Sequence, residues 1–141
     1  MVFGKHLILD CNNCQGNITT RYNIQKFIDE LCVLSNMQKK GETIFEYFPE
    51  NEFNIKNDIV GYSVCQIISL SSITMHINNI SKTFYFDFFT CGQIDIDLVV
   101  DLFDKYFKPK TIKKIMLIRD AIDITCPFFE EQVDHLRPCD E

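Results

Sequence analysis

Four side chains with potential chemical reactivity lie between residues 61 and 92, in a stretch that is otherwise mainly apolar, aromatic or β-branched. They are two serines, a histidine and a cysteine: Ser63, Ser71, His76 and Cys91. A serine hydroxyl or a cysteine thiol can act as a nucleophile or a proton donor, and an imidazole can act as a general base near neutral pH. The stretch therefore predicts a catalytic or self-processing site, provided that the fold brings these side chains together.

The same stretch has the pattern of three consecutive β-strands, because β-branched and aromatic residues dominate between plausible turns. The turns are expected at Leu70-Ser71 and at residues 79–82. The expected strands are Tyr62 to Ser69, Ser72 to Asn78 and Thr83 to Thr90. This pattern predicts a meander of two successive hairpins.

Antiparallel pairing about these turns predicts which side chains are neighbours. It places Ser71 opposite residues 89 to 91, and so beside Cys91. It places His76 opposite residue 64 or 65, one step from Ser63. The two pairs are far apart, because five residues of strand span roughly 16 Å at about 3.3 Å per residue. A single site that uses all four side chains therefore requires a sharp bend or a second subunit.

At these residues the chain resembles the small bacterial and archaeal type of S-adenosylmethionine decarboxylase. In that family a serine at a strand junction is followed by a T-x-H histidine and then by the cysteine of an F-T-C-G motif. The same spacing occurs here in Ser71, Thr74-Met75-His76 and Phe89-Thr90-Cys91-Gly92. Gly61-Tyr62-Ser63 and the start Gly4-Lys5-His6-Leu7, with Cys14 beyond it, also match. The resemblance extends over about residues 4 to 119.

The resemblance implies a self-cleaving enzyme with a covalent prosthetic group. Cleavage between Leu70 and Ser71 would convert Ser71 into a pyruvoyl group, which takes the place of a diffusible cofactor. Ser63 and His76 match the residues that assist this processing, and Cys91 matches the proton donor to the substrate. The implied product, decarboxylated S-adenosylmethionine, serves spermidine biosynthesis. Members of the family are also homodimers with sites at the interface, which agrees with the second subunit required above.

Some positions differ from the family pattern. The family has a glutamate before the precursor serine and a histidine after it, where this chain has Leu70 and Ser72. After the T-x-H histidine it has nucleoside-binding residues, where this chain has Asn78, Asn79 and Ile80.

Two alternatives therefore stay open: a pyruvoyl-dependent decarboxylase of another amino acid, such as arginine or ornithine, and an unprocessed homologue that acts as a partner or regulator. Other residues that can offer a stacking surface to an adenine are Phe53, Tyr62, Phe84 and Phe86.

Composition limits the function classes. With 141 residues the chain is expected to form a single domain, residues 1–141, and its net charge of −6 disfavours general binding of nucleic acids. No apolar run reaches the roughly 18 residues of a membrane span, and the short, polar-flanked start does not resemble a signal peptide. We therefore expect a cytoplasmic protein whose partners are a small amino-acid-type substrate and a second copy of the chain.

The chain has seven cysteines, an odd number that fits reduced thiols better than a disulfide framework. Cys11 and Cys14 form a C-x-x-C pair, but no second such pair or H-x-x-x-H completes the four ligands of a zinc site. We expect these two residues to end the first strand and expect no metal.

The remaining pattern supplies the elements that must position the site. A helix capped by Thr19 or Thr20 is expected to run to about Met37, and another from Ile94 to Phe107. Further strands are expected at Lys5 to Cys11, Glu42 to Phe48 and Thr111 to Ile118, with a polar loop at residues 50–58 and an irregular tail after residue 119. The order β-α-β-β-β-β-α-β predicts an α+β fold, a two-layer α/β sandwich with two helices on one face of a mostly antiparallel sheet.

Overall fold

The structure is a computed structural model that describes residues 4–122 and 128–137. Its strands are β1 (Gly4–Asn12), β2 (Ile44–Phe48), β3 (Gly61–Ile68), β4 (Ser71–Asn78), β5 (Thr83–Thr90), β6 (Thr111–Arg119) and β7 (Phe128–His135). Its helices are α1 (Arg21–Leu34), α2 (Glu52–Lys56) and α3 (Ile96–Phe107).

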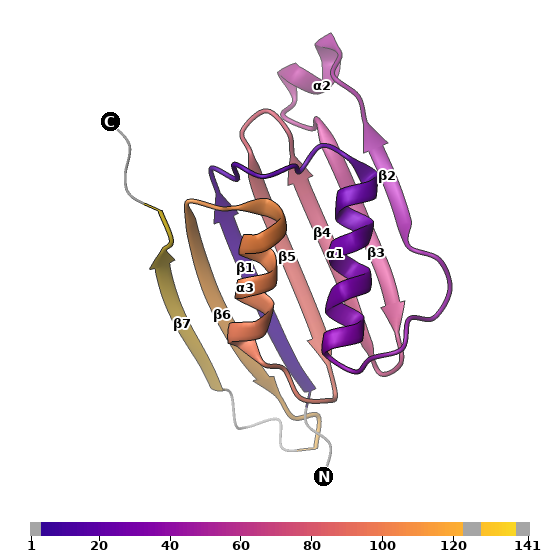
Figure 1. The fold of residues 1–141 in the computed structure, drawn as a ribbon, viewed down its shortest axis with the longest axis vertical. Helices are drawn as coiled ribbons and strands as arrows, with labels where there is room; N and C mark the ends of the chain where they lie inside the picture. Colours follow the sequence, from indigo (N-terminus) through magenta and orange to yellow (C-terminus); the bar gives the residue numbers. More distant parts are fainter. Residues whose placement is uncertain (1–3, 123–127, 138–141) are drawn as a thin grey trace.

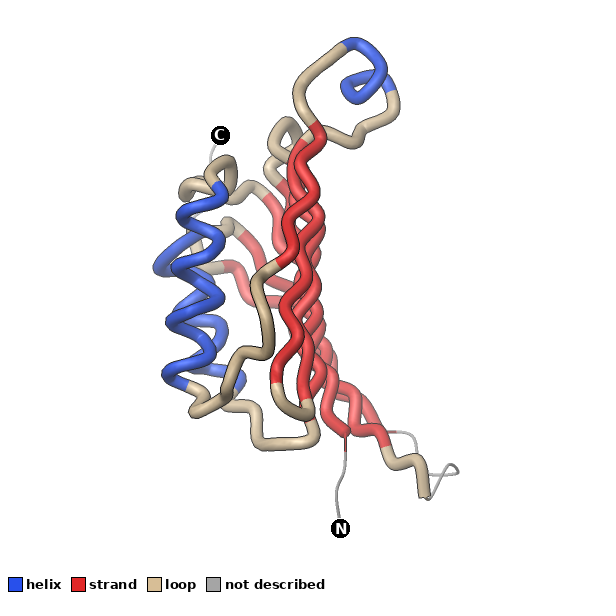
Figure 2. The backbone as a smooth tube through the Cα atoms, turned by 90° about the vertical axis from the view of Figure 1, so that its right-hand side faces the viewer, coloured by secondary structure: helices blue, strands red, loops and turns tan. Residues whose placement is uncertain are grey.

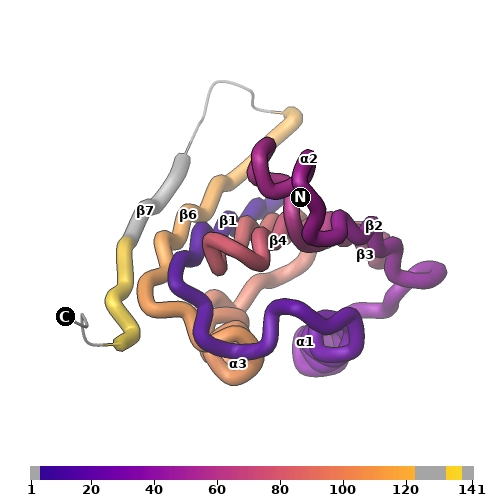
Figure 3. Tube along the Cα trace, turned by 90° about the horizontal axis from the view of Figure 1, so that it is seen from above, coloured from indigo at the N-terminus to yellow at the C-terminus, as the bar shows by residue number. Residues whose placement is uncertain are grey.

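The strands form one antiparallel sheet in the order β2-β3-β4-β5-β1-β6-β7 (Figure 1). Helices α1 and α3 lie side by side against one face of it, as the view along the strands shows (Figure 3). No helix of the described residues covers the other face, which is called the open face below (Figure 2). The predicted α+β two-layer sandwich is confirmed.

The core lies between the sheet and the two long helices. Alternate residues of β5 point towards the helices and are fully buried, whereas the residues between them face the open side. Aromatic rings from both layers pack edge to face, for example Phe27 of α1 against Phe103 of α3 and Phe86 of β5. Burial of each such side chain stabilises the fold by about 1.5–3 kcal/mol.

Helix α1 ends three residues earlier than the pattern predicted. Asn36 adopts a left-handed φ of 54°, and the N–H groups of Asn36 and Met37 donate to the carbonyls of Val33 and Cys32. This is the hydrogen-bond pattern of a Schellman cap, which stops the helix at Leu34. The chain beyond it, residues 38–40, then lies along the end of β3, where the Ser69 N–H donates to the Gln38 carbonyl at 3.1 Å.

Two elements were not predicted. The expected loop at residues 50–58 contains the short helix α2, which Asn51 caps by accepting from the Asn54 N–H. The tail, expected to be irregular, contributes β7, which pairs with the outer edge of β6. A five-residue helix and an edge strand have too little periodicity to identify, and each depends on the structure beside it.

Candidate active site

The first group of candidate residues surrounds the turn between β3 and β4. Ser71 is the first residue of β4 and pairs with Thr90, the last residue of β5. Both side chains point to the helix-covered face, where Ser71 is 9% and Thr90 1% exposed. The Ser71 hydroxyl donates to Thr90 Oγ1 at 2.6 Å, and the Gly92 N–H donates to the same oxygen at 2.9 Å. The hydroxyl of Ser71 therefore has a fixed direction.

The peptide bond that precedes Ser71 is held from the end of β5. The Cys91 N–H donates to the carbonyl oxygen of Leu70 at 3.1 Å. A hydrogen-bond donor on this oxygen stabilises the negative charge that develops if a nucleophile attacks the carbonyl carbon. The predicted proximity of Ser71 and Cys91 is thus confirmed, and Cys91 contributes its backbone as well as its thiol to the neighbourhood.

Leu70 itself has a strained backbone. Its φ is 58°, a left-handed conformation that is unfavourable for a residue with a Cβ by about 1–2 kcal/mol. Its side chain is 77% exposed, so burial of that side chain does not compensate. The hydrogen bonds of its two neighbours, Ser69 to Gln38 and Ser71 to Thr90, hold the turn in place. Strain of this kind is concentrated at functional sites.

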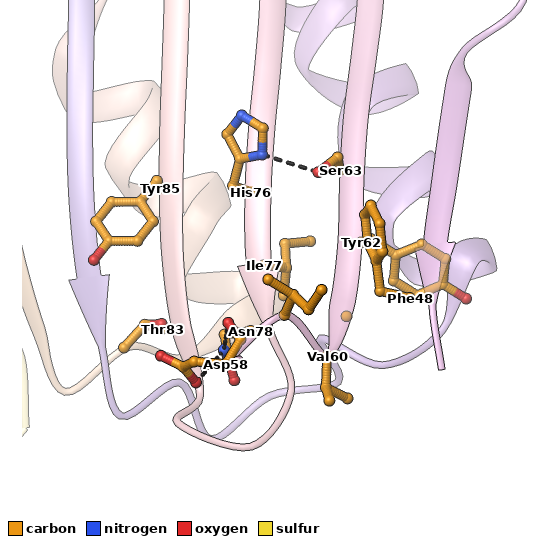
Figure 4. Close-up of a pocket in the computed structure, with 12 residues that line it drawn as sticks. Phe48, Asp58, Val60, Tyr62, Ser63, His76, Ile77, Asn78, Thr83 and Tyr85 are labelled. Atoms are coloured by element: carbon orange, nitrogen blue, oxygen red, sulfur yellow. Dashed lines mark hydrogen bonds between the residues drawn. The ribbon is translucent and has the colours of Figure 1, made fainter. Parts of the chain in front are cut away.

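The second group lies on the open face, where β3 and β4 pair. Ser63 is directly opposite His76, one position from the predicted pairing, and Ser63 Oγ lies 3.0 Å from His76 Nδ1 (Figure 4). When Nδ1 carries the ring proton and donates to Ser63, Nε2 keeps its lone pair and can accept a proton. In that state the Ser63 hydroxyl is free to donate its own hydrogen to another group. The pair can therefore act as a base and a hydrogen-bond donor.

A hollow of about 280 Å³ surrounds this pair. Asp58 lies at one end of it, and the Asn78 amide donates to the Asp58 carboxylate at 2.8 Å (Figure 4). The ring of Tyr85 on β5 borders the hollow beside His76 (Figure 4). Its lining comprises Phe48, Asp58, Ile59, Val60, Gly61, Tyr62, Ser63, His76, Ile77, Asn78, Thr83 and Tyr85. It thus combines flat aromatic faces, a carboxylate and a base.

The two groups do not meet within one chain. Ser71 and His76 are five residues apart on β4, roughly 16 Å at about 3.3 Å per residue. The odd separation also places Ser71 on the helix-covered face and His76 on the open face. A second hollow, of about 410 Å³, is lined by Leu70, Ser71, Thr90 and Cys91 but by neither Ser63 nor His76.

Three residues of these groups were missed in the sequence. Thr90 was part of the F-T-C-G motif, and the predicted pairing already placed it among the partners of Ser71. Asp58 lies at the end of the polar loop expected at residues 50–58 but was not singled out within it, and Tyr85 carried no signal, because only the sheet brings it beside His76. Of the expected stacking residues, Tyr62 lines the hollow, whereas Phe84 and Phe86 were wrong: both are fully buried between the sheet and the helices.

The C-x-x-C pair has the expected structural position. Cys11 lies in β1 and Cys14 just beyond it, and both thiols are buried. Burial raises the pKa of the Cys14 thiol to about 12 and raises the pKa of Cys11 as well, so both stay protonated. Among the residues that the structure describes, no group of His, Cys, Asp or Glu side chains is arranged to hold a metal ion.

The same described residues include no helix long and apolar enough to cross a membrane.

Compared with known proteins, residues 5–120 match a family model described as S-adenosylmethionine decarboxylase. No curated protein matches the sequence.

Proposed function

The chain belongs to the S-adenosylmethionine decarboxylase family, and from this we propose that it is a pyruvoyl-dependent enzyme that cleaves itself between Leu70 and Ser71. The family identifies it as a lyase of polyamine biosynthesis with S-adenosylmethionine as the implied substrate. The proposed product is decarboxylated S-adenosylmethionine for spermidine biosynthesis. We place the enzyme in the cytoplasm, since the described cysteines are free thiols.

One observation carries the proposal: a fixed hydroxyl, the carbonyl that precedes it and a donor to that carbonyl oxygen all meet at the β3–β4 turn. In the first step Ser71 Oγ bonds to the carbonyl carbon of Leu70, the C–N bond breaks, and the amide becomes an ester with a free amine on Ser71. The Cys91 N–H stabilises the charge on the Leu70 oxygen during this step. The hydroxyl's proton ends on the amine, so the step needs no further reactant.

The second step removes the α-proton of Ser71, which releases the Leu70 carboxylate as a new chain end. Hydrolysis then releases ammonia and leaves a pyruvoyl group at position 71. His76 is the proposed base and Ser63 its partner, donating to the ester carbonyl. Because a chain's own His76 lies five strand residues, roughly 16 Å, from its Ser71, we assign this role to the partner subunit's His76.

The assignment requires a homodimer, and we propose the open face as its interface. That face presents exposed apolar side chains, among them Ile44, Ile67 and Tyr85, and no helix of the described residues covers it. Exposed apolar side chains on an uncovered face are typical of an interaction site. His76 is exposed on the same face, so association there would place it in the interface with the partner subunit.

The hollow around His76 contains groups of the kind that the substrate needs. Tyr85 offers a flat surface for an adenine, and Asp58 offers a carboxylate for the ribose diol. We propose that these residues bind the nucleoside in place of positions 78–80, where the family has its nucleoside-binding residues and this chain has Asn78, Asn79 and Ile80. The pyruvoyl group would bind the substrate amine and accept the electron pair released with carbon dioxide. Cys91, which follows β5 at the same turn, is the proposed proton donor to the substrate carbon.

The proposal is tested by the intact mass of the purified protein under denaturing conditions. We expect two chains, residues 1–70 and 71–141, the second with a pyruvoyl group in place of Ser71, and a single 16.5 kDa chain for Ser71→Ala. Carbon dioxide release is then measured with S-adenosylmethionine, arginine and ornithine. Release from a free amino acid alone would identify the other decarboxylase, and an uncleaved wild-type chain would identify the regulator.

A further inference from the structure

We propose that Thr90 is a catalytic residue of self-cleavage, whose hydroxyl oxygen orients the Ser71 nucleophile towards the Leu70 carbonyl. The proposal rests on the self-cleavage proposed above and adds to it the residue that prepares the nucleophile.

Burial makes Thr90 the partner of the Ser71 hydroxyl. Both side chains are largely withdrawn from solvent on the helix-covered face, Thr90 almost completely, and a buried setting strengthens a hydrogen bond. The 2.6 Å separation of the two oxygens is at the short end of the O–H···O range. A free serine hydroxyl rotates among several directions. The Ser71 hydroxyl instead points its hydrogen at Thr90 Oγ1, which leaves its oxygen lone pairs available for nucleophilic attack.

Thr90 is itself held in position. Its β-branched side chain has few rotamers, and the Gly92 N–H donates to Oγ1 at 2.9 Å. A Cβ at position 92 would lie only 3.3 Å from the same oxygen, so the glycine allows the backbone to approach the hydroxyl closely. The hydrogen bond that fixes Ser71 is therefore anchored in backbone.

The end of β5 thus holds both reacting groups. Thr90 Oγ1 binds the nucleophile, the Cys91 N–H binds the oxygen of the electrophile, and the Gly92 N–H binds Thr90. Because these contacts come from three consecutive residues, the positions of the Ser71 hydroxyl and the Leu70 carbonyl are coupled. Such positioning is a large contribution to an intramolecular reaction.

Thr90 is unchanged by the reaction. The hydrogen bond to Thr90 aligns Ser71 Oγ before the attack, and it is given up as Oγ bonds to the Leu70 carbonyl carbon and the Ser71 O–H bond breaks. The proton ends on the Ser71 nitrogen as the C–N bond breaks. No oxidant, reductant or metal is needed.

The test compares Thr90→Val, which keeps the shape but removes the acceptor, with Thr90→Ser, which keeps the hydroxyl. We expect cleavage to slow by at least about 10-fold in Thr90→Val and by much less in Thr90→Ser. Thr19→Val, at an exposed threonine in the loop before α1, is the matched control and should cleave at the wild-type rate. Rates are read from the two chain masses over time, and melting temperatures show that the variants are folded.

Hydroxylamine, which cleaves esters, separates this role from a structural one. It should fail to accelerate cleavage of Thr90→Val, because the block precedes the ester, and should cleave His76→Ala, where the ester accumulates. Wild-type cleavage in Thr90→Val would overturn the proposal for Thr90 while leaving the proposed function intact. An uncleaved wild-type chain would instead contradict the proposed function.

If Thr90→Val does not fold, Gly92→Ala tests the role of Thr90 in its place. Its Cβ would press on Thr90 Oγ1, so we expect slower cleavage. An unchanged rate in that variant would count against Thr90.

Discussion

Cys91 and Leu70 are joined by a backbone hydrogen bond of 3.1 Å, from the N–H of the first to the carbonyl oxygen of the second. The residue proposed to protonate the substrate therefore also contacts the bond proposed to be cut. The two contributions come from different atoms, since the first uses the thiol and the second the backbone. They can be separated by mutation.

The first prediction is that Cys91→Ala cleaves itself but decarboxylates poorly. The variant keeps the N–H that binds the Leu70 oxygen, so both chains should appear by mass. The steady-state rate of carbon dioxide release should fall by about 100-fold or more, because protonation of the substrate carbon completes each turnover and the positioned proton donor is absent. Cys14→Ala, beyond β1 at the opposite end of the sheet from Leu70, is the control and should retain activity. An uncleaved Cys91→Ala chain would show that the thiol takes part in processing.

The second prediction concerns the origin of the base. Ser71→Ala and His76→Ala should each remain uncleaved when expressed alone. In mixed dimers, the His76→Ala chain keeps its Ser71 and can use the partner subunit's His76, so we expect about half of those dimers' chains to be cut. Differently tagged chains, purified together and weighed intact, provide the measurement. Mixed dimers without any cleavage would place the base in the same chain as its serine.

Much of this arrangement was predictable from turn positions. The β4–β5 hairpin turns where the sequence indicated, and Ser71 was correctly placed beside the end of β5. The β3–β4 turn lies one residue earlier than expected, at Ser69 and Leu70, which brings Ser63 directly opposite His76. The left-handed Leu70 explains the error, because leucine is not a residue that such a turn favours.

The faces of the sheet were predictable but were not predicted. An odd separation along a strand always places two side chains on opposite faces, so Ser71 and His76 were already separated in the sequence. The hollow was not predictable, because Asp58 and Tyr85 come from different parts of the chain and meet only through strand pairing. Local patterns give the elements, whereas the site depends on their register.

The third prediction tests the hollow. Asp58→Asn keeps an acceptor for the Asn78 amide but removes the charge proposed to bind the ribose diol. A lost charge-assisted hydrogen bond is worth about 1.5–3 kcal/mol, so KM for S-adenosylmethionine should rise by about 10-fold or more. The ribose does not react, so kcat should change little. Asp101→Asn, exposed on α3, is the control, and an unchanged KM in Asp58→Asn would place the ribose elsewhere.

The last prediction concerns the helices that cover Ser71 and Thr90. Tyr106 of α3 donates its hydroxyl to Glu30 of α1 at 2.6 Å, and Lys105 also donates to that carboxylate. These hydrogen bonds, that of Tyr106 above all, lower the pKa of Glu30 from its ordinary 4.5, and the contact with Glu30 raises the pKa of Tyr106 to about 12. The hydrogen bond therefore favours the ionised carboxylate and links the two helices.

Tyr106→Phe should lower the free energy of unfolding at pH 7 by about 1 kcal/mol, allowing for partial exposure of the pair. Because the folded-state pKa of Glu30 is lowered, its stabilisation is complete above the unfolded-state pKa and is lost as the pH falls through the folded value. The difference in the free energy of unfolding between wild type and variant should accordingly shrink in acid. Urea unfolding at pH 7 and at a pH below the folded-state pKa of Glu30 provides the measurement. Tyr22→Phe, an exposed tyrosine on α1, is the matched control. A difference that stays the same in acid would mean that Tyr106 stabilises the helices by packing rather than through the carboxylate.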